Sequence, residues 1–146
     1  MAQVSQEDSG ALIADDICVV AAGLVCTLAN SAYTPKELAF QYNDSGAKLI
    51  FTSEDGIATV LSALEDLGIN REEGRKRIVV MGAGLQWCGG PAAPKRTEAT
   101  GLLQMQDLLG RGMLSQEEKF DGKDCHKTTY MCYSSGMRGD LDRFRY

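Results

Sequence analysis

Residues 47–81 read AKLIFTSEDGIATVLSALEDLGINREEGRKRIVVM, and this stretch decides the fold. Residues 47–52 and 78–81 are short, largely apolar runs, which is typical of interior strands. Between them, apolar residues recur at the spacing of one helix face: Ile57, Val60, Leu61, Leu64 and Leu67. A strand, a helix and a strand with short connections predict a parallel sheet with a right-handed crossover.

Polar residues and glycine mark the ends of this helix. Ser53 is suited to cap its start, because a Ser side chain there accepts a backbone hydrogen bond. Glu54 and Asp55 follow it in the first turn, where the helix dipole favours negative charge. Gly68 is placed to stop the helix. We expect the charged residues 70–77 to form a loop that leads to the next strand.

A second helix is predicted upstream, over residues 34–45. Thr34 is a favourable N-cap, Pro35 suits the first helical position, and Glu37 completes a capping box. Gly46 can end the helix in the left-handed conformation. This helix would connect the strand at 47–52 to an earlier one at 24–29.

Residues 17–29 form an apolar run in which Thr27 is the one clearly polar member. The run is shorter than the roughly 20 residues of a membrane-spanning helix, so a buried segment is expected and no membrane span. Residues 1–16 contain four acidic residues and no Lys or Arg, which excludes a secretory signal or organellar presequence. We therefore interpret 1–16 as an acidic segment open to disorder, in a cytoplasmic protein.

Length, composition and net charge limit the classes of protein to which the chain can belong. At 146 residues, 44% hydrophobic and 24% charged, the chain has the composition of one globular domain. A formal net charge of −5 gives it no general attraction to nucleic acid or to anionic lipid. We therefore expect neither as a partner.

Residues 128–139, TTYMCYSSGMRG, predict a strand at 130–133 that runs into a small, glycine-rich loop. In this loop, the backbone N–H groups and hydroxyls of small residues can surround an anion. The candidate phosphate-binding residues are Ser134, Ser135, Gly136 and Gly139. By itself such a sequence is more often a plain turn.

The run Tyr133-Ser134-Ser135-Gly136 with Gly139 resembles the phosphate-binding loop of AMP-forming acyl-activating enzymes, the superfamily of acyl-CoA synthetases and 4-coumarate CoA ligases. A second resemblance lies upstream, in AAGLVCTLANSAYTPKEL at 21–38 and in DSGAK at 44–48. Together they cover about residues 17–139. The implied fold class is α/β, an incomplete parallel-sheet βαβαβ part of the large N-terminal domain of an adenylate-forming enzyme. The family also has a strand before residue 17, and we expect this chain to lack it.

The resemblance implies a ligase that uses ATP, Mg²⁺ and CoA to activate a carboxylic acid, with the four loop residues holding phosphate. The chain departs from the family after Gly136, because the family's paired Thr or Ser residues and its lysine are missing and Arg138 stands nearby. Residues 140–146 are interpreted as a divergent, unpatterned tail. We accordingly expect no catalytic residue in this chain and an inactive ligase fragment. A non-catalytic truncated product or interaction module is the alternative, and a full-length relative could be peroxisomal.

Two other patterns are weaker. Gly82-Ala83-Gly84 follows a predicted strand, as in NAD(P)-binding oxidoreductases, but Trp87 occupies the third glycine position and 82–100 reads as a loop. Cys125 and His126 lie near Cys132 without the spacing of a zinc site, so no metal ligand is expected. A short helix is predicted at 102–109 and a polar connection at 115–127.

Overall fold

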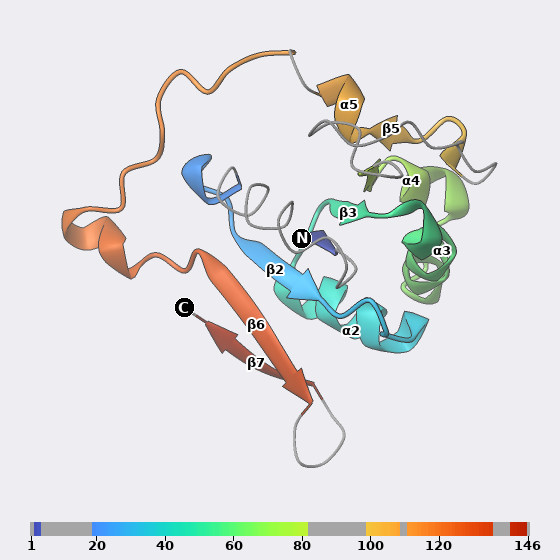
Figure 1. Ribbon diagram of the computed structural model, residues 1–146. Coiled ribbons are helices and arrows are strands. Elements are labelled where there is room, and N and C mark those ends of the chain that lie inside the picture. The colour runs from blue at the N-terminus through green and yellow to red at the C-terminus, as the bar shows by residue number, and fades with distance from the viewer. Residues whose placement is uncertain (1, 4–18, 82–98, 109–110, 136–140, 146) are drawn as a thin grey trace.

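The computed structural model of the protein describes residues 2–3, 19–81, 99–108, 111–135 and 141–145. Seven strands form one sheet in the order β5-β4-β3-β1-β2-β6-β7 (Figure 1). All neighbouring strands are parallel except β6 and β7. The strands are β1 (Ala2–Gln3), β2 (Cys26–Ala29), β3 (Ile50–Thr52), β4 (Ile78–Val80), β5 (Leu103–Gln104), β6 (Tyr130–Ser135) and β7 (Leu141–Arg145).

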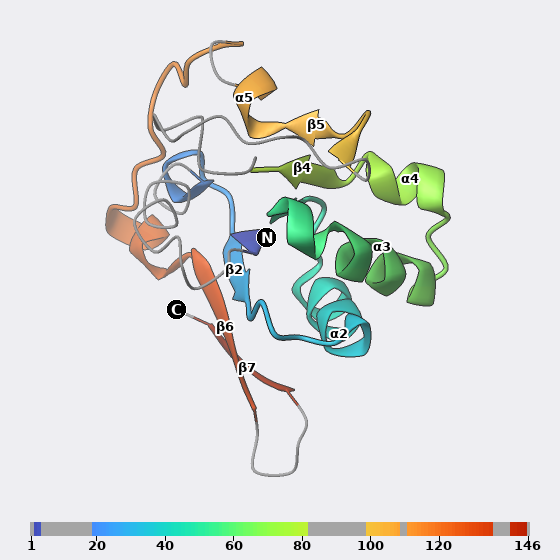
Figure 2. The same ribbon diagram turned by 45° about the vertical axis from the view of Figure 1, so that its right-hand side comes forward.

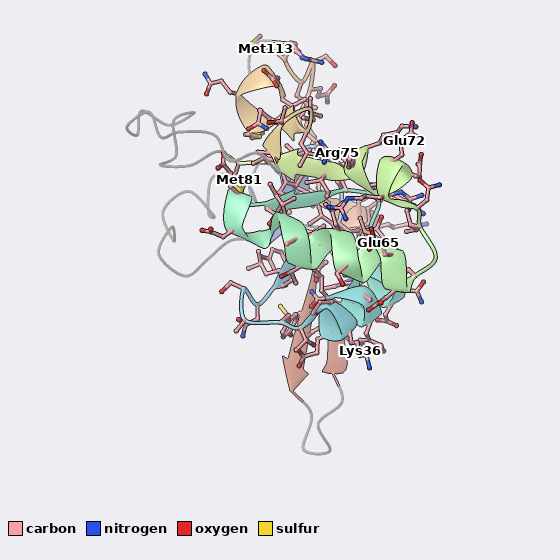
Figure 3. All side chains as sticks on the ribbon, turned by 90° about the vertical axis from the view of Figure 1, so that its right-hand side faces the viewer. Lys36, Glu65, Glu72, Arg75, Met81 and Met113 are labelled. Carbon is pink, nitrogen blue, oxygen red and sulfur yellow. The ribbon has the colours of Figure 1, made fainter. Side chains whose placement is uncertain are left out.

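Helices connect the parallel strands, and the predicted α/β class is confirmed. The α-helices are α2 (Pro35–Ser45), α3 (Ile57–Asp66), α4 (Arg71–Arg75) and α5 (Met105–Leu108), and the 3-10 helices are η2 (Glu54–Gly56) and η5 (Gly122–His126). Helix α2 joins β2 to β3, and α3 precedes α4 and β4. Lys36, Glu65 and Glu72 are exposed on α2, α3 and α4 (Figure 3). No helix among the described residues is long and apolar enough to cross a membrane.

One apolar core lies between the two long helices and the sheet. As predicted, Val60, Leu61 and Leu64 of α3 are buried, together with Ile50 of β3 and Ile78 of β4. Ile50 and Ile78 are also direct partners in the β3–β4 ladder. The core therefore follows from the apolar spacing of α3 and the two apolar strands on either side of it.

The predicted boundaries of α2 are confirmed. The Thr34 hydroxyl accepts a hydrogen bond from Glu37 N, and the Glu37 carboxylate accepts one from Thr34 N at 2.8 Å. The hydrogen bonds from Thr34 lower the pKa of the exposed Glu37 carboxyl. Gly46 caps the other end in the left-handed conformation with φ 67°.

Three local predictions were wrong. Residues 70–77 contain helix α4, because the Asn70 side chain caps it by accepting from Glu73 N at 2.9 Å. Ser53 makes no capping hydrogen bond with its side chain, and η2 leads into α3 instead. The segment 102–109 begins as strand β5 beside β4 before the short α5, because parallel pairing with β4 satisfies its backbone.

Both ends of the chain also differ from the predictions. A strand does precede residue 17, since β1 pairs with β2 and β3 through Ala2. The tail predicted to lack a pattern forms β7, which pairs with β6 along its whole length. The apolar run 17–29 is not uniformly buried, because Leu24 is 60% exposed ahead of β2.

Core packing gives a first test. Replacing Leu64 by Ala removes side-chain atoms from a fully packed site, so we expect the free energy of unfolding to fall by about 2–5 kcal/mol. Leu114→Ala is the matched control, because Leu114 is exposed and should change stability by less than about 0.5 kcal/mol. Urea denaturation measures both, and equal effects would contradict the described core.

Candidate phosphate-binding site

Strand β6 places the first two predicted site residues, Ser134 and Ser135, at the end of the sheet where the parallel strands have their carboxyl ends. It runs parallel to β2, with Cys26 opposite Tyr130 and Thr27 opposite Met131. Ser134 and Ser135 are its last two residues. They therefore lie toward the carboxyl end of a parallel strand, the edge at which open α/β sheets bind ligands.

The other two predicted residues, Gly136 and Gly139, lie outside the described residues, as do Arg138 and the Gly82-Ala83-Gly84 stretch. Their roles stay predictions. What the structure describes is the strand that leads into the loop and the strand that follows it.

A buried polar junction holds β6 against β2 and α2. The Thr27 hydroxyl donates to the Met131 carbonyl at 2.6 Å and accepts from Gln41 Nε2 at 2.8 Å. Gln41 Nε2 also donates to the Leu28 carbonyl at 2.9 Å. Gln41 Oε1 is buried without a hydrogen-bond partner among the described residues. One hydroxyl thus links a helix and two strands.

A second link lies next to Ser134. The Tyr133 hydroxyl donates to the Asp44 carboxylate of α2 at 2.7 Å, and both side chains are half-buried. The Phe40 ring packs edge-on against Tyr133, with ring centroids 6.5 Å apart. Tyr133 and Asp44 belong to the two stretches that carry the family resemblance, so the structure brings those stretches together. The sequence showed both stretches but not this contact, because their separation along the chain hides it.

On its other side β6 is paired with β7. Ser134 lies opposite Asp142, and Ser135 lies opposite Leu141. The peptide groups of successive strand residues point to opposite edges, so one of the two serines directs its N–H toward β7 and the other away from it. The β6–β7 ladder therefore leaves one of the two serine N–H groups unused.

Other features lie apart from this strand end. Burial and the nearby Glu37 raise the pKa of Tyr33, which follows β2 at the same edge of the sheet. A largely apolar cavity of about 380 Å³ has among its lining residues Leu24, Val25 and Leu49, which precede β2 and β3. It therefore lies toward the opposite, amino ends of those strands. In the described part of the chain, no group of three His, Cys, Asp or Glu side chains is placed to hold a metal ion.

The sequence profile of the family described as AMP-binding enzyme matches residues 9–140. The chain belongs to this family. Its predicted relationship to the adenylate-forming superfamily is thus confirmed over nearly the whole chain. No curated protein matches the chain.

Among solved structures, the chain is similar to a natural red-emitting luciferase from Phrixothrix hirtus. The TM-score is 0.69 at 16% sequence identity, and the match covers 99% of this chain and 25% of the luciferase. At this identity the likeness shows the fold alone. This AMP-binding family member thus spans about a quarter of the luciferase's length.

The buried junction gives a second test. Thr27→Val leaves the Met131 carbonyl without this donor, so we expect a loss of about 1–3 kcal/mol in the free energy of unfolding. Adding Gln41→Leu removes a second partner of the network, and the double variant should lose less than the sum of the two single losses. Urea denaturation of the double-mutant cycle measures the coupling. Additive losses would show that Thr27 and Gln41 act independently.

Proposed function

We propose that the chain carries the phosphate-loop part of an acid:CoA ligase domain, and that these 146 residues bind ATP weakly and do not adenylate an acid. The observation that supports this most directly is the position of Ser134 and Ser135 at the end of β6, with the preceding Tyr133 bonded to Asp44. A strand ending in two small residues, one with a backbone N–H that the β6–β7 ladder does not use, suits a phosphate oxygen.

In the reaction of a complete acid:CoA ligase, a carboxylate oxygen attacks the α-phosphorus of ATP, pyrophosphate leaves, and the CoA thiol then displaces AMP from the acyl-adenylate. Ser134, Ser135, Gly136 and Gly139 would hold the β- and γ-phosphates by N–H and hydroxyl groups. Their contribution is electrostatic stabilisation of phosphate charge, which Mg²⁺ supplements when it is bound. ATP and a carboxylic acid are the proposed small-molecule partners, and the cytoplasm is the proposed location.

The charges near the loop argue for weak binding. Asp142 lies in register with Ser134, and the sequence after Gly136 has arginine but no lysine. An acidic residue near a phosphate site raises the free energy of the bound anion, while the flanking arginines lower it. Strand β6, which precedes the proposed loop, thus pairs with β7, whose sequence contains both acidic and basic residues.

The size of the expected affinity follows from typical contact energies. Hydrogen bonds contribute about 0.5–1.5 kcal/mol each, or about 1.5–3 kcal/mol when one partner is charged. Association itself costs at least about 4 kcal/mol. A few loop contacts therefore leave little surplus, and we expect an ATP dissociation constant of about 1 mM or weaker.

An ATP titration followed by NMR tests this affinity. We expect shifts at Ser134 and Ser135 with millimolar affinity that Gly136→Val abolishes, because a Val side chain there would obstruct an anion-binding loop. Gly112→Val is the matched control, since Gly112 is exposed with open space around its Cα. Shifts that vanish as the salt rises to 1 M, and are equal in both variants, would mean non-specific attraction to arginine.

Catalysis is tested separately, by carboxylate-dependent exchange of labelled pyrophosphate into ATP. We expect no exchange above the enzyme-free rate with a panel of aromatic and fatty acids, because the loop lacks the family's lysine. An active acid:CoA ligase serves as the positive control. Exchange that depends on both the acid and Gly136 would overturn the proposed inactivity.

A further inference from the structure

The ladder between β6 and β2 stops short of the phosphate loop. Among the described residues, its registered pairs are at Tyr130 and Met131, whereas β6 continues through Ser135. On its other side, residues 131–135 pair with β7, which belongs to the same hairpin. Figure 2 shows the hairpin of β6 and β7 extending past α2, away from the other strands. The end of the hairpin therefore depends on side chains for its position relative to the core.

Helix α2 supplies such side chains at two successive levels. Gln41 reaches Thr27, which in turn bonds Met131, at the last registered pair of the ladder. Asp44, one turn further along α2, reaches Tyr133. Because Met131 and Tyr133 are two residues apart in a strand, they lie on the same face of β6, the face toward α2.

We propose that Asp44 and Tyr133 are positioning residues that tie the phosphate loop to the α/β core. The Tyr133 hydroxyl holds β6 to α2 one residue before Ser134, at the point where the β2 ladder no longer does so. This inference rests on the proposed function only in calling the loop a phosphate site. The tie itself is a property of the ligand-free chain.

The hydrogen bond from the Tyr133 hydroxyl has a charged acceptor, the Asp44 carboxylate. A hydrogen bond to a carboxylate contributes more than one between neutral groups, and half-burial reduces its competition with water. Phe40 packs against the same ring, so Tyr133→Phe removes the hydroxyl and can retain the ring contact. This makes the hydroxyl separable from the packing of the side chain.

Amide hydrogen exchange in the full chain without ligand tests the tie. In Asp44→Ala and in Tyr133→Phe, we expect amides in 132–135 to exchange at least about tenfold faster, whereas those of β3 and β4 keep their rates. Asp44→Asn retains an acceptor oxygen without its charge, so it should restore part of the protection. Asp66→Ala is the matched control, because Asp66 is an exposed acid at the end of α3.

The variants distinguish a local tie from a general loss of stability. If Asp44→Ala leaves 132–135 unchanged, or accelerates β3 and β4 equally, the proposal is wrong. A double variant, Asp44→Ala with Tyr133→Phe, should exchange no faster than the faster single variant, since the Tyr133–Asp44 hydrogen bond can be lost only once. Additive acceleration would show that the two residues act separately, and would overturn the tie.

An ATP titration of the same variants separates this proposal from the proposed function. We expect the dissociation constant to rise about three- to tenfold in Asp44→Ala and to recover in part in Asp44→Asn. Local acceleration of exchange without ATP binding in any variant would reject the phosphate site and retain the tie. ATP binding at Ser134 and Ser135 with no change in exchange would reject the tie and retain the site.

Discussion

The hydroxyl of Thr27 is the interaction on which the arrangement of the candidate site depends. It is buried, it donates to the backbone of β6, and it accepts from a helix that crosses the same strands. An apolar residue of the same size would fill the space but would leave a backbone carbonyl and an amide without this partner. The polar residue inside an otherwise apolar strand therefore fixes the register of β2 and β6 and their position relative to α2. That register places Met131, from which β6 continues toward Ser134.

The sequence predicted the central part of the fold because two independent signals agree there. The apolar spacing of α3 and the capping box at Thr34 both specify local structure, and the tertiary structure does not oppose either. One failure lies where the pairing partners are distant in sequence: β1 has two residues, and its strand conformation depends on β2 and β3. β7 instead pairs with its neighbour β6 in one hairpin, and its mixture of charged and apolar residues did not identify it as a strand. The charged residues 70–77 contain a helix and not the predicted loop for another reason: the Asn70 side chain caps the helix start.

In the candidate site too, local sequence patterns predicted some residues, whereas a contact between residues distant in sequence was not predictable. Small residues after an apolar strand identify Ser134 and Ser135 from the sequence alone, because the requirement for unobstructed N–H groups is local. The contact between Tyr133 and Asp44 could not be predicted in this way. It requires knowledge of which face of β6 meets α2, and that face is set by the Thr27 junction. Each residue lay in a recognised stretch, yet only the packing of the helix shows that they touch.

Membership of the AMP-binding family does not by itself fix the activity of this chain. Up to Ser135, β2 pairs with β6, and Asp44 of α2 bonds Tyr133 just ahead of the predicted loop. From Leu141 onward, the chain turns back along β6 and places Asp142 opposite Ser134. A phosphate site needs donors that converge on one anion, whereas antiparallel pairing directs half of a strand's donors to its partner. The same backbone groups cannot satisfy both demands in full. The fold is thus that of the adenylate-forming family, while the proposed phosphate binding depends on how many donors the hairpin leaves for the anion.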